Sequence, residues 1–482
     1  MQELALIIVP FVLALVSFLK KSGKWDKAIM VTVAAFHLVV TLSLCIRGST
    51  VANILGADSL GCLFLLILST LFGATTLSST PFIKYTEEGY FNYRYVIFML
   101  LLLGSLTGVI LSRNIGIMWV FAVAATLAST PLIWHYGDRE SLEVVWKYTL
   151  ICAVGLALAF VGVLAMVEGS KDIAGATLGV DLLARGAALI SPRWGRVAIA
   201  FTLIGYAAQM GMAPMHAWLA DVYEQAPSPV AAFFSGAMVS CAFLGILRYY
   251  QIFASTPLIA DFREVLLLIG LFSIFVGAVY ILKADNFKRK LASCNIQHMG
   301  LLWVGMGLGA DSVYATMLYV LSYSLAKHLM LLTSGNFLRA YGTINTSEIS
   351  GGLSCMPRSS WLLIVGAFVL VGIMPSGVFI GEFMLFRRMI AYPHLLYLGG
   401  VILTVSLTLM TIAAYAIISA TLHITLSYDN TSVFTQGTEP LVSHAPQWVF
   451  IALLLIIALY IPRQLDVIIR GAASLLGGSG GF

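Results

Sequence analysis

Charged residues are scarce in this sequence. Asp, Glu, Lys and Arg make up 10% of its 482 residues and hydrophobic residues 60%, whereas a soluble globular protein carries roughly 25% charged residues. A water-soluble surface cannot be built from this composition, so we expect one polytopic transmembrane domain over residues 1–482. The net charge of +5 fits positively charged loops at an anionic lipid leaflet and does not indicate nucleic-acid binding.

Closely spaced cysteines are also missing. Zinc, iron–sulfur and thioredoxin-like sites need such pairs, and we interpret the six scattered cysteines as small core residues; they are Cys45, Cys62, Cys152, Cys241, Cys294 and Cys355. The sequence has no dinucleotide fingerprint, phosphate-binding loop or metal-ligand spacing. It therefore predicts no catalytic residue, no cofactor and no metal site in this chain.

Long apolar runs are abundant. A helix needs about 20 apolar residues to cross the hydrocarbon core, and by that measure the sequence predicts an all-α protein with about fourteen transmembrane helices. Their expected centres are Leu13, Val39, Ile67, Leu102, Ala124, Ala157, Gly205, Val239, Leu268, Val304, Leu329, Leu370, Leu407 and Leu454. An even number of spans places both termini on one side of the membrane.

Basic residues gather in two loops that both follow odd-numbered spans. The clusters are Lys20, Lys21, Lys24 and Lys27, and Lys283, Lys288, Arg289 and Lys290. Because cytoplasmic loops are enriched in Lys and Arg, we expect both loops in the cytoplasm and both termini outside. The apolar run from Glu3 to Phe18 has basic residues after it and none before it, which indicates a signal anchor or first span and not a cleaved signal peptide. The polar segment 168–196 predicts a surface helix.

Two predicted spans carry glycine and proline at mid-membrane, at 205–214 and 372–377. Proline removes a backbone donor, so a broken helix survives in lipid only where it lines protein or water. A matched pair of breaks, in helices 7 and 12, indicates an inverted-repeat transporter architecture. Simple proline kinks in a packed bundle are the alternative.

Two ionisable residues lie deep in apolar spans. A charge at the bilayer centre costs about 2.5–3.5 kcal/mol, so Lys327 and Glu382 are candidates for a proton path. Tyr319, Tyr323 and Lys327 recur every four residues, which puts them on one helix face where they could form a hydrogen-bonded column. A structural ion pair, or a side chain reaching for the membrane edge, is the alternative for either charge.

Two histidines extend this set. His298 can pass protons near pH 7, although a lone histidine in a span is more often only hydrogen-bonded. His216 lies beyond the first break, next to Trp218, and could equally be an interfacial anchor.

Several motifs resemble those of the antiporter-like proton-translocating subunits of respiratory complex I, Mrp antiporters and group 4 membrane hydrogenases. They are MAPMHAWL at 212–219, APSPV at 226–230, FKRKLA at 287–292, HMG at 298–300, SLAK at 324–327 and GN at 335–336. Within the family, NIGIMWV at 114–120 and LYIP at 459–462 are most similar to the component F group of hydrogenase-4. The resemblance covers nearly the whole chain.

The resemblance implies fourteen helices with two inverted five-helix repeats, an antiporter-like half at 94–252 and another at 262–425. It also implies a path in which a glutamate on the fifth helix pairs with a lysine on the broken seventh helix. That path continues through polar residues to Lys327 and to an ionisable group on the broken twelfth helix, here Glu382. We place His298, Tyr323 and His216 along it.

This sequence departs from the family pattern in its first half. The expected glutamate is Val123, the expected lysine is Gln209, and the polar position of the eighth helix is Ser240. Losing both partners together is coherent, because one buried charge left alone costs about 3–5 kcal/mol. The sequence therefore predicts a first half-channel that no longer carries charge.

The leading functional hypothesis is a non-catalytic membrane subunit of a redox-driven proton- or sodium-translocating complex in the inner (cytoplasmic) membrane. Its expected partners are sister antiporter-like and small membrane subunits of a complex I-like membrane arm, peripheral hydrogenase-like or dehydrogenase-like iron–sulfur subunits, and lipid. Three alternatives stay open: a structural scaffold without net ion translocation, an Mrp-type cation/proton antiporter subunit, and the membrane subunit of an inorganic-carbon uptake system.

Overall fold

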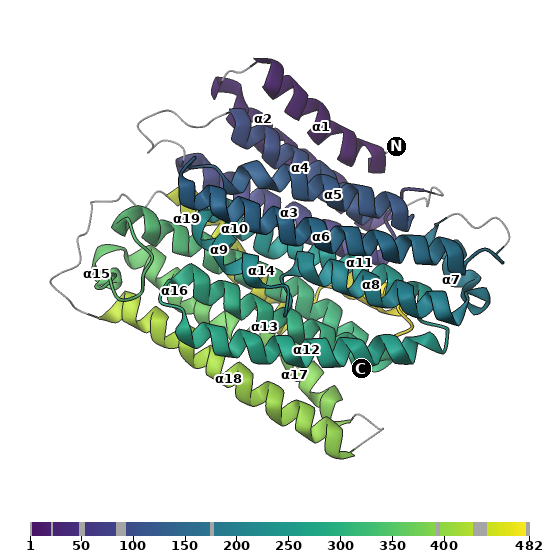
Figure 1. Cartoon of the computed structure of the whole chain (residues 1–482). Coiled ribbons are helices and arrows are strands. Elements are labelled where there is room, and N and C mark those ends of the chain that lie inside the picture. Colours follow the sequence, from purple (N-terminus) through teal and green to yellow (C-terminus); the bar gives the residue numbers. More distant parts are fainter. Residues whose placement is uncertain are drawn as a thin grey trace.

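The computed structural model describes residues 2–20, 23–47, 54–82, 93–173, 178–391, 396–427 and 441–478, and in these ranges its regular structure is entirely helical (Figure 1). The helices of the N-terminal half are α1 (Gln2–Lys20), α2 (Gly23–Arg47), α3 (Ser59–Phe82), α4 (Tyr93–Leu111), α5 (Ile115–Ile133), α6 (Arg139–Gly169), α7 (Val180–Arg185), the 3₁₀ turn η1 (Ala187–Leu189), α8 (Pro192–Met210), α9 (Ala217–Gln225), α10 (Ser228–Phe233), the π-helical turn η2 (Phe234–Met238) and α11 (Val239–Phe253). The predicted all-α fold is confirmed.

The remaining helices follow without a change of architecture. They are α12 (Leu258–Lys283), α13 (Phe287–Gly307), the 3₁₀ turn η3 (Ala310–Ser312), α14 (Val313–Tyr341), α15 (Gly352–Cys355), α16 (Pro357–Leu370), α17 (Gly377–Ile390), α18 (Leu396–Leu426), α19 (Leu441–Leu459) and α20 (Arg463–Leu475). The short α7 lies in the polar segment 168–196, as the sequence predicts.

Every predicted span centre falls in a helix, but not every helix is a simple crossing. Among the described residues, 10 helices are long and apolar enough to cross a membrane, or up to 11 if α19 and α20, bent by 75°, form one span. The three remaining predicted spans, whose helices α8, α13 and α16 do not meet this criterion of length and hydrophobicity, still have a helix at their predicted centres. The helix α16 has only 14 residues, whereas α8 and α13 carry charged and polar residues, so hydrophobicity alone undercounts helices that line a polar interior.

The helix α14 lies at the centre of the bundle. It contacts α3, α10, α13, α16, α17, α19 and α20, and every residue from Val313 to Phe337 is buried. Figure 1 shows α1 and α2 along one edge of the molecule and α18 along the opposite edge. Because α14 is surrounded by protein, its polar residues need partners from neighbouring helices.

Contacts between loops show how the crossings alternate. We number the spans in the order predicted from the sequence. The loops that follow spans 2, 4 and 6 are joined by the backbone bridges Leu55–Ser112 and Asn114–Gly179. The loops that follow spans 9 and 11 are joined by the bridge Asn286–Asn345. Chain segments that alternate between two membrane faces produce this pairing.

The two predicted helix breaks are both present. The first helix, α8, ends at Gly211, which has a left-handed φ of 68°, and the chain resumes as α9. The second, α16, is followed by Gly372 with a φ of 71°, and the chain resumes as α17. Glycine suits both positions because it lacks the Cβ that disfavours this conformation. The boundaries of the two halves, 94–252 and 262–425, stay a prediction.

Candidate ion pathway

Lys327 is buried in α14 among neutral groups. Its ammonium donates hydrogen bonds to the backbone oxygen of Ser235 at 2.8 Å and to Oδ1 of Asn295 on α13. Its Nζ also lies 5.4 Å from the ring centroid of Tyr223 and 5.7 Å from that of Tyr323. Within the described part of the chain Lys327 has no carboxylate within ion-pairing distance. The structure therefore does not support the structural ion pair as an explanation of this lysine.

Ser235 belongs to η2, the π-helical turn between α10 and α11. Such turns are rare and frequently occur at functional sites, because their i→i+5 hydrogen bonds shift the backbone groups out of the α-helical register. Here the turn presents one carbonyl directly to the Lys327 ammonium.

Glu382 on α17 lies at the other end of the polar cluster. The Tyr319 hydroxyl donates a hydrogen bond to its Oε1 at 3.1 Å and is also hydrogen-bonded to Nδ1 of His298. Nδ1 of His298 is 3.7 Å from the same carboxylate oxygen. All three side chains are buried, so Tyr319 connects a base on α13 with an acid on α17.

Aromatic rings lie between Lys327 and the group formed by Glu382, Tyr319 and His298. The ring of His298 stacks on that of Tyr323 with centroids 4.3 Å apart, and Tyr323 stacks on Tyr319 at 5.8 Å. Tyr319, Tyr323 and Lys327 thus share one face of α14 as the spacing predicts, and the two tyrosine rings stack on each other instead of forming a hydrogen-bonded column. The structure brings together four predicted path residues: Lys327, Glu382, His298 and Tyr323.

His216 lies elsewhere. It precedes α9, is half-buried, and packs its ring edge-on against Tyr280 of α12 with centroids 4.9 Å apart. Among the described residues it makes no hydrogen bond to the cluster around Lys327. Its place in the path stays a prediction.

In the first half, the described polar groups next to Gln209 are uncharged, and they include Ser129, which is hydrogen-bonded to Tyr148. The Gln209 amide donates a hydrogen bond to the Thr126 hydroxyl at 2.7 Å, and Val123 packs partly buried against the hydrophobic core. Beside Gln209 lies a cavity of about 10 Å³ with a mostly apolar lining, which is barely room for one water. Ser240 on α11 shares a hydrogen bond of 3.0 Å with Ser324 on α14 and so connects this region to the central helix.

Three residues beside this path were missed by sequence reasoning. Asn295 precedes His298 by three residues, so its position on the same helix face could have identified it. Tyr223 and His328 gave no such signal. His328 is buried and its ring nitrogens contact the backbone oxygen of Ala232 at 3.0 Å and the Thr75 hydroxyl at 3.2 Å, and these partners lie far away in the sequence.

A largely buried carboxylate, Asp58 before α3, joins helix α11 to the loop between α4 and α5. Asp58 accepts hydrogen bonds from Arg248 at 2.6 and 2.9 Å, and lies 2.5 Å from Arg113, which also pairs with Asp181. Burial alone would raise the pKa of Asp58, but the two guanidinium groups and the Gly61 amide outweigh it and lower that pKa below its ordinary value. Nowhere in the described ranges do three His, Cys, Asp or Glu residues gather in a way that could hold a metal ion.

Comparisons with known proteins agree with this arrangement. The family described as NADH:quinone oxidoreductase/Mrp antiporter, transmembrane, matches residues 112–411. The chain is 28% identical over 406 residues to a hydrogenase-4 component F homolog of Methylacidiphilum infernorum, with 82% of this chain and 85% of that protein covered. It is 29% identical to an NADH-quinone oxidoreductase subunit N of Ectopseudomonas mendocina, with 66% and 65% covered.

Longer relatives are matched only in part. A Na⁺/H⁺ antiporter subunit of Alkalihalophilus pseudofirmus is 24% identical, and the match covers 80% of this chain but 51% of that protein. The chain therefore spans about two thirds of the length of the subunit N relative and about half the length of this antiporter subunit.

Solved structures show the same fold. A chain of an archaeal membrane-bound sulfane sulfur reductase matches with a TM-score of 0.87 at 19% identity, covering 99% of this chain and 98% of that chain. A chain of the Mrp complex of Dietzia matches with a TM-score of 0.84 at 17% identity, covering 98% and 96%. This protein belongs to the NADH:quinone oxidoreductase/Mrp antiporter transmembrane family and is a multi-pass, antiporter-like subunit of the complex I, Mrp and hydrogenase-4 type.

Proposed function

We propose that this chain is a non-catalytic membrane subunit of a redox-driven complex and that it moves protons, or sodium ions, through its second half only. The observation that carries this proposal is a buried cluster in which ring contacts through Tyr323 join Lys327 to His298, and hydrogen bonds through Tyr319 join His298 to Glu382. Ionisable groups in a membrane interior are costly and mark ion pathways by default.

The cluster has the chemistry that a relay needs. The Lys327 ammonium is held by a backbone carbonyl and an amide oxygen, so losing its proton leaves no buried carboxylate unpaired. Glu382 is contacted by a tyrosine hydroxyl and lies near a histidine nitrogen, both of which can donate or accept hydrogen bonds. The partners of Lys327 and of Glu382 can therefore hydrogen-bond to each residue in both its protonated and its deprotonated form.

The first half supports no equivalent relay. Gln209 and Thr126 form a neutral hydrogen bond, and an amide neither binds nor releases a proton near neutral pH. At the break of α8, Gln209 accordingly supplies hydrogen bonding but cannot take up or release a proton. This asymmetry also favours a second candidate function, a scaffold subunit that connects active sister subunits without net translocation.

The setting of the proposed function follows from the relatives, which are subunits of multi-subunit membrane complexes. We propose sister antiporter-like subunits, small membrane subunits and a peripheral hydrogenase-like or dehydrogenase-like iron–sulfur arm as partners. We place the complex in the inner (cytoplasmic) membrane, with the basic segments around Lys24 and Arg289 in the cytoplasm and the termini outside.

The deciding experiment compares Lys327→Met and Glu382→Gln in the assembled complex, reconstituted in vesicles. We expect each change to reduce redox-coupled proton uptake strongly while electron transfer in the peripheral arm continues. Gln209→Leu is the matched control, because it removes a buried polar group from the first half and should leave uptake nearly unchanged. Unchanged uptake in both charge variants, with normal assembly, would favour the scaffold.

A further inference from the structure

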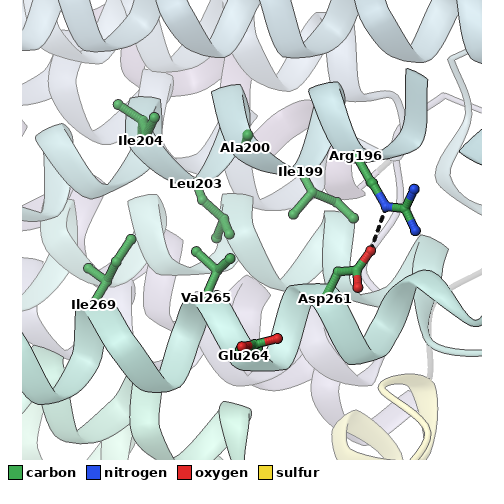
Figure 2. A pocket seen from close by; sticks show the side chains of 9 residues that line it. All are labelled: Arg196, Ile199, Ala200, Leu203, Ile204, Asp261, Glu264, Val265 and Ile269. Carbon is green, nitrogen blue, oxygen red and sulfur yellow. Dashed lines mark hydrogen bonds and ion pairs between the residues drawn. The ribbon is translucent and has the colours of Figure 1, made fainter. Parts of the chain in front are cut away.

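A groove of about 480 Å³ lies between α8 and α12, on the outside of the bundle and away from the polar cluster around Lys327. Figure 2 shows an ion pair, Arg196 with Asp261, at one end of this groove, and Ile204 and Ile269 at the other. The other lining residues are Ile199, Ala200, Leu203, Glu264 and Val265. The groove is therefore charged at one end and apolar over the rest of its length.

The groove exists because α8 and α12 pack mainly against other helices. The main neighbour of α8 is α6 and that of α12 is α13, and the two helices contact each other only slightly. The Arg196–Asp261 ion pair joins the two helices at one end of the groove. Ile204 follows Arg196 by eight residues, and Ile269 follows Asp261 by eight residues, so the groove extends about 12 Å along the helices. The groove follows the boundary between the two predicted antiporter-like halves.

The charged end lies where a membrane surface would be. Arg196 and Asp261 are near the first turns of their helices, and apolar sequence follows both. Trp194 is 38% exposed at the same end of α8, and tryptophan is enriched at the lipid headgroup level. Further along α12, Leu268 and Phe272 are exposed, so the surface beyond the groove is apolar as well.

Charge complementarity identifies the occupant. Arg196 and Asp261, 2.7 Å apart, are 65% and 45% exposed. Glu264 follows one turn after Asp261, is exposed, and makes no hydrogen bond or ion pair with any described residue. The rim thus offers one cation and two anions, which fits a ligand that carries both a phosphate and an ammonium group.

We propose that this groove binds a phospholipid with a primary amine headgroup, such as phosphatidylethanolamine. The phosphate binds Arg196, the ammonium donates hydrogen bonds to Glu264 and Asp261, and one acyl chain lies along Ile204 and Val265. An anionic headgroup without an amine would meet two carboxylates, and a trimethylammonium headgroup has no N–H to donate. The bound lipid seals the boundary between the two halves.

The test uses the intact complex, stripped of lipid and given phosphatidylethanolamine, phosphatidylglycerol or phosphatidylcholine with the same photoreactive acyl chain. Mass spectrometry of peptides from α8 and α12 then locates the crosslinks. We expect the ethanolamine lipid to label residues 200–204 and 265–269, and Glu264→Gln to weaken its labelling about tenfold. Ala200→Trp should abolish labelling by filling the groove, whereas Arg193→Gln, at the same membrane level but outside the groove, should change nothing.

Three results would overturn the proposal. One is equal labelling by all three lipids, and another is full labelling in the Ala200→Trp variant. The third is a crosslink showing that a helix of a sister subunit occupies the groove in the assembled complex. Since Glu264 is an exposed side chain, its variant should assemble normally even if the bulky tryptophan does not.

Discussion

The Lys327 ammonium on α14 donates a 2.8 Å hydrogen bond to the backbone carbonyl of Ser235 in η2. A backbone carbonyl carries no net charge and no side-chain substitution removes it, so this part of the lysine site is fixed by the π-helical turn. The amide of Asn295 supplies the other acceptor. Because both acceptors are uncharged, no negative charge holds the proton on Lys327. Replacing the Asn295 amide by a carboxylate therefore tests the relay.

Asn295→Asp should trap the proton on Lys327. A carboxylate in place of the amide oxygen favours the charged ammonium, and we expect redox-coupled proton uptake to fall roughly tenfold or more. Asn295→Gln, which keeps a neutral amide, is the control and should retain most of the uptake. The measurement is the initial rate of uptake in vesicles at equal amounts of assembled complex. A rate in Asn295→Asp equal to that of the unaltered protein would argue against a relay through Lys327.

Gln209→Leu should have a small effect on stability and almost none on ion movement. The hydrogen bond to Thr126 is lost, but the Thr126 hydroxyl also contacts the backbone oxygen of Ala122 at 3.0 Å, so we expect a loss of about 1 kcal/mol. Thermal unfolding of the purified complex measures the first effect and vesicle uptake the second.

Restoring the family pair provides a further test of the first half. Val123→Glu together with Gln209→Lys should assemble better than either change alone, because each single change buries a charge without its partner at about 3–5 kcal/mol. The amount of assembled complex in membranes, determined by native electrophoresis, compares the three variants. If the double variant assembles no better than the singles, the two positions do not face each other as the family pattern implies.

Asp58→Asn should destabilise the bundle far more than the loss of an exposed pair. It leaves Arg248, which is fully buried, and Arg113 without their shared carboxylate, at about 3–5 kcal/mol. Glu168→Gln breaks the exposed Glu168–Lys171 pair and should change stability by less than about 0.5 kcal/mol. Thermal unfolding of both variants against the unaltered protein gives the comparison, and similar losses in the two would contradict it.

The same carboxylate predicts a pH dependence. Because folding lowers the pKa of Asp58, its stabilising contribution is complete above the unfolded value of about 4 and is lost as the pH falls through the lower folded value. The stability difference between the unaltered protein and Asp58→Asn should therefore be constant near neutral pH and shrink only under strongly acidic conditions. A difference that shrinks between pH 8 and 6 would point to another group.

The orientation can be tested with a residue that is already present. Cys355 is the exposed one of the six cysteines, and it ends the short helix α15 between α14 and α16, in a segment that should be cytoplasmic. A membrane-impermeant maleimide should label it in inside-out vesicles and not in right-side-out vesicles, with Cys355→Ser as the control. Labelling only in right-side-out vesicles would reverse the assignment.

The sequence by itself determined the class of the protein. Low charge and long apolar runs require a lipid-embedded helical bundle, since each helix satisfies its own backbone hydrogen bonds. Gly211 and Gly372 with their nearby prolines marked both breaks, because these residues act on the local backbone. Lys327 and Glu382 were also evident, since a charge inside an apolar run is conspicuous without a structure.

Only the tertiary structure decided what these charges touch. The partners of Lys327 lie 92 and 32 residues away, at Ser235 and Asn295, and no local pattern specifies such contacts. Whether Lys327 faced a carboxylate or neutral acceptors depended on how α13, α14 and η2 pack together. The groove beside Arg196 and Glu264 likewise exists only because α8 and α12 each pack against a different neighbour. Periodicity reports the face of one helix, whereas a site between helices depends on their relative positions in space.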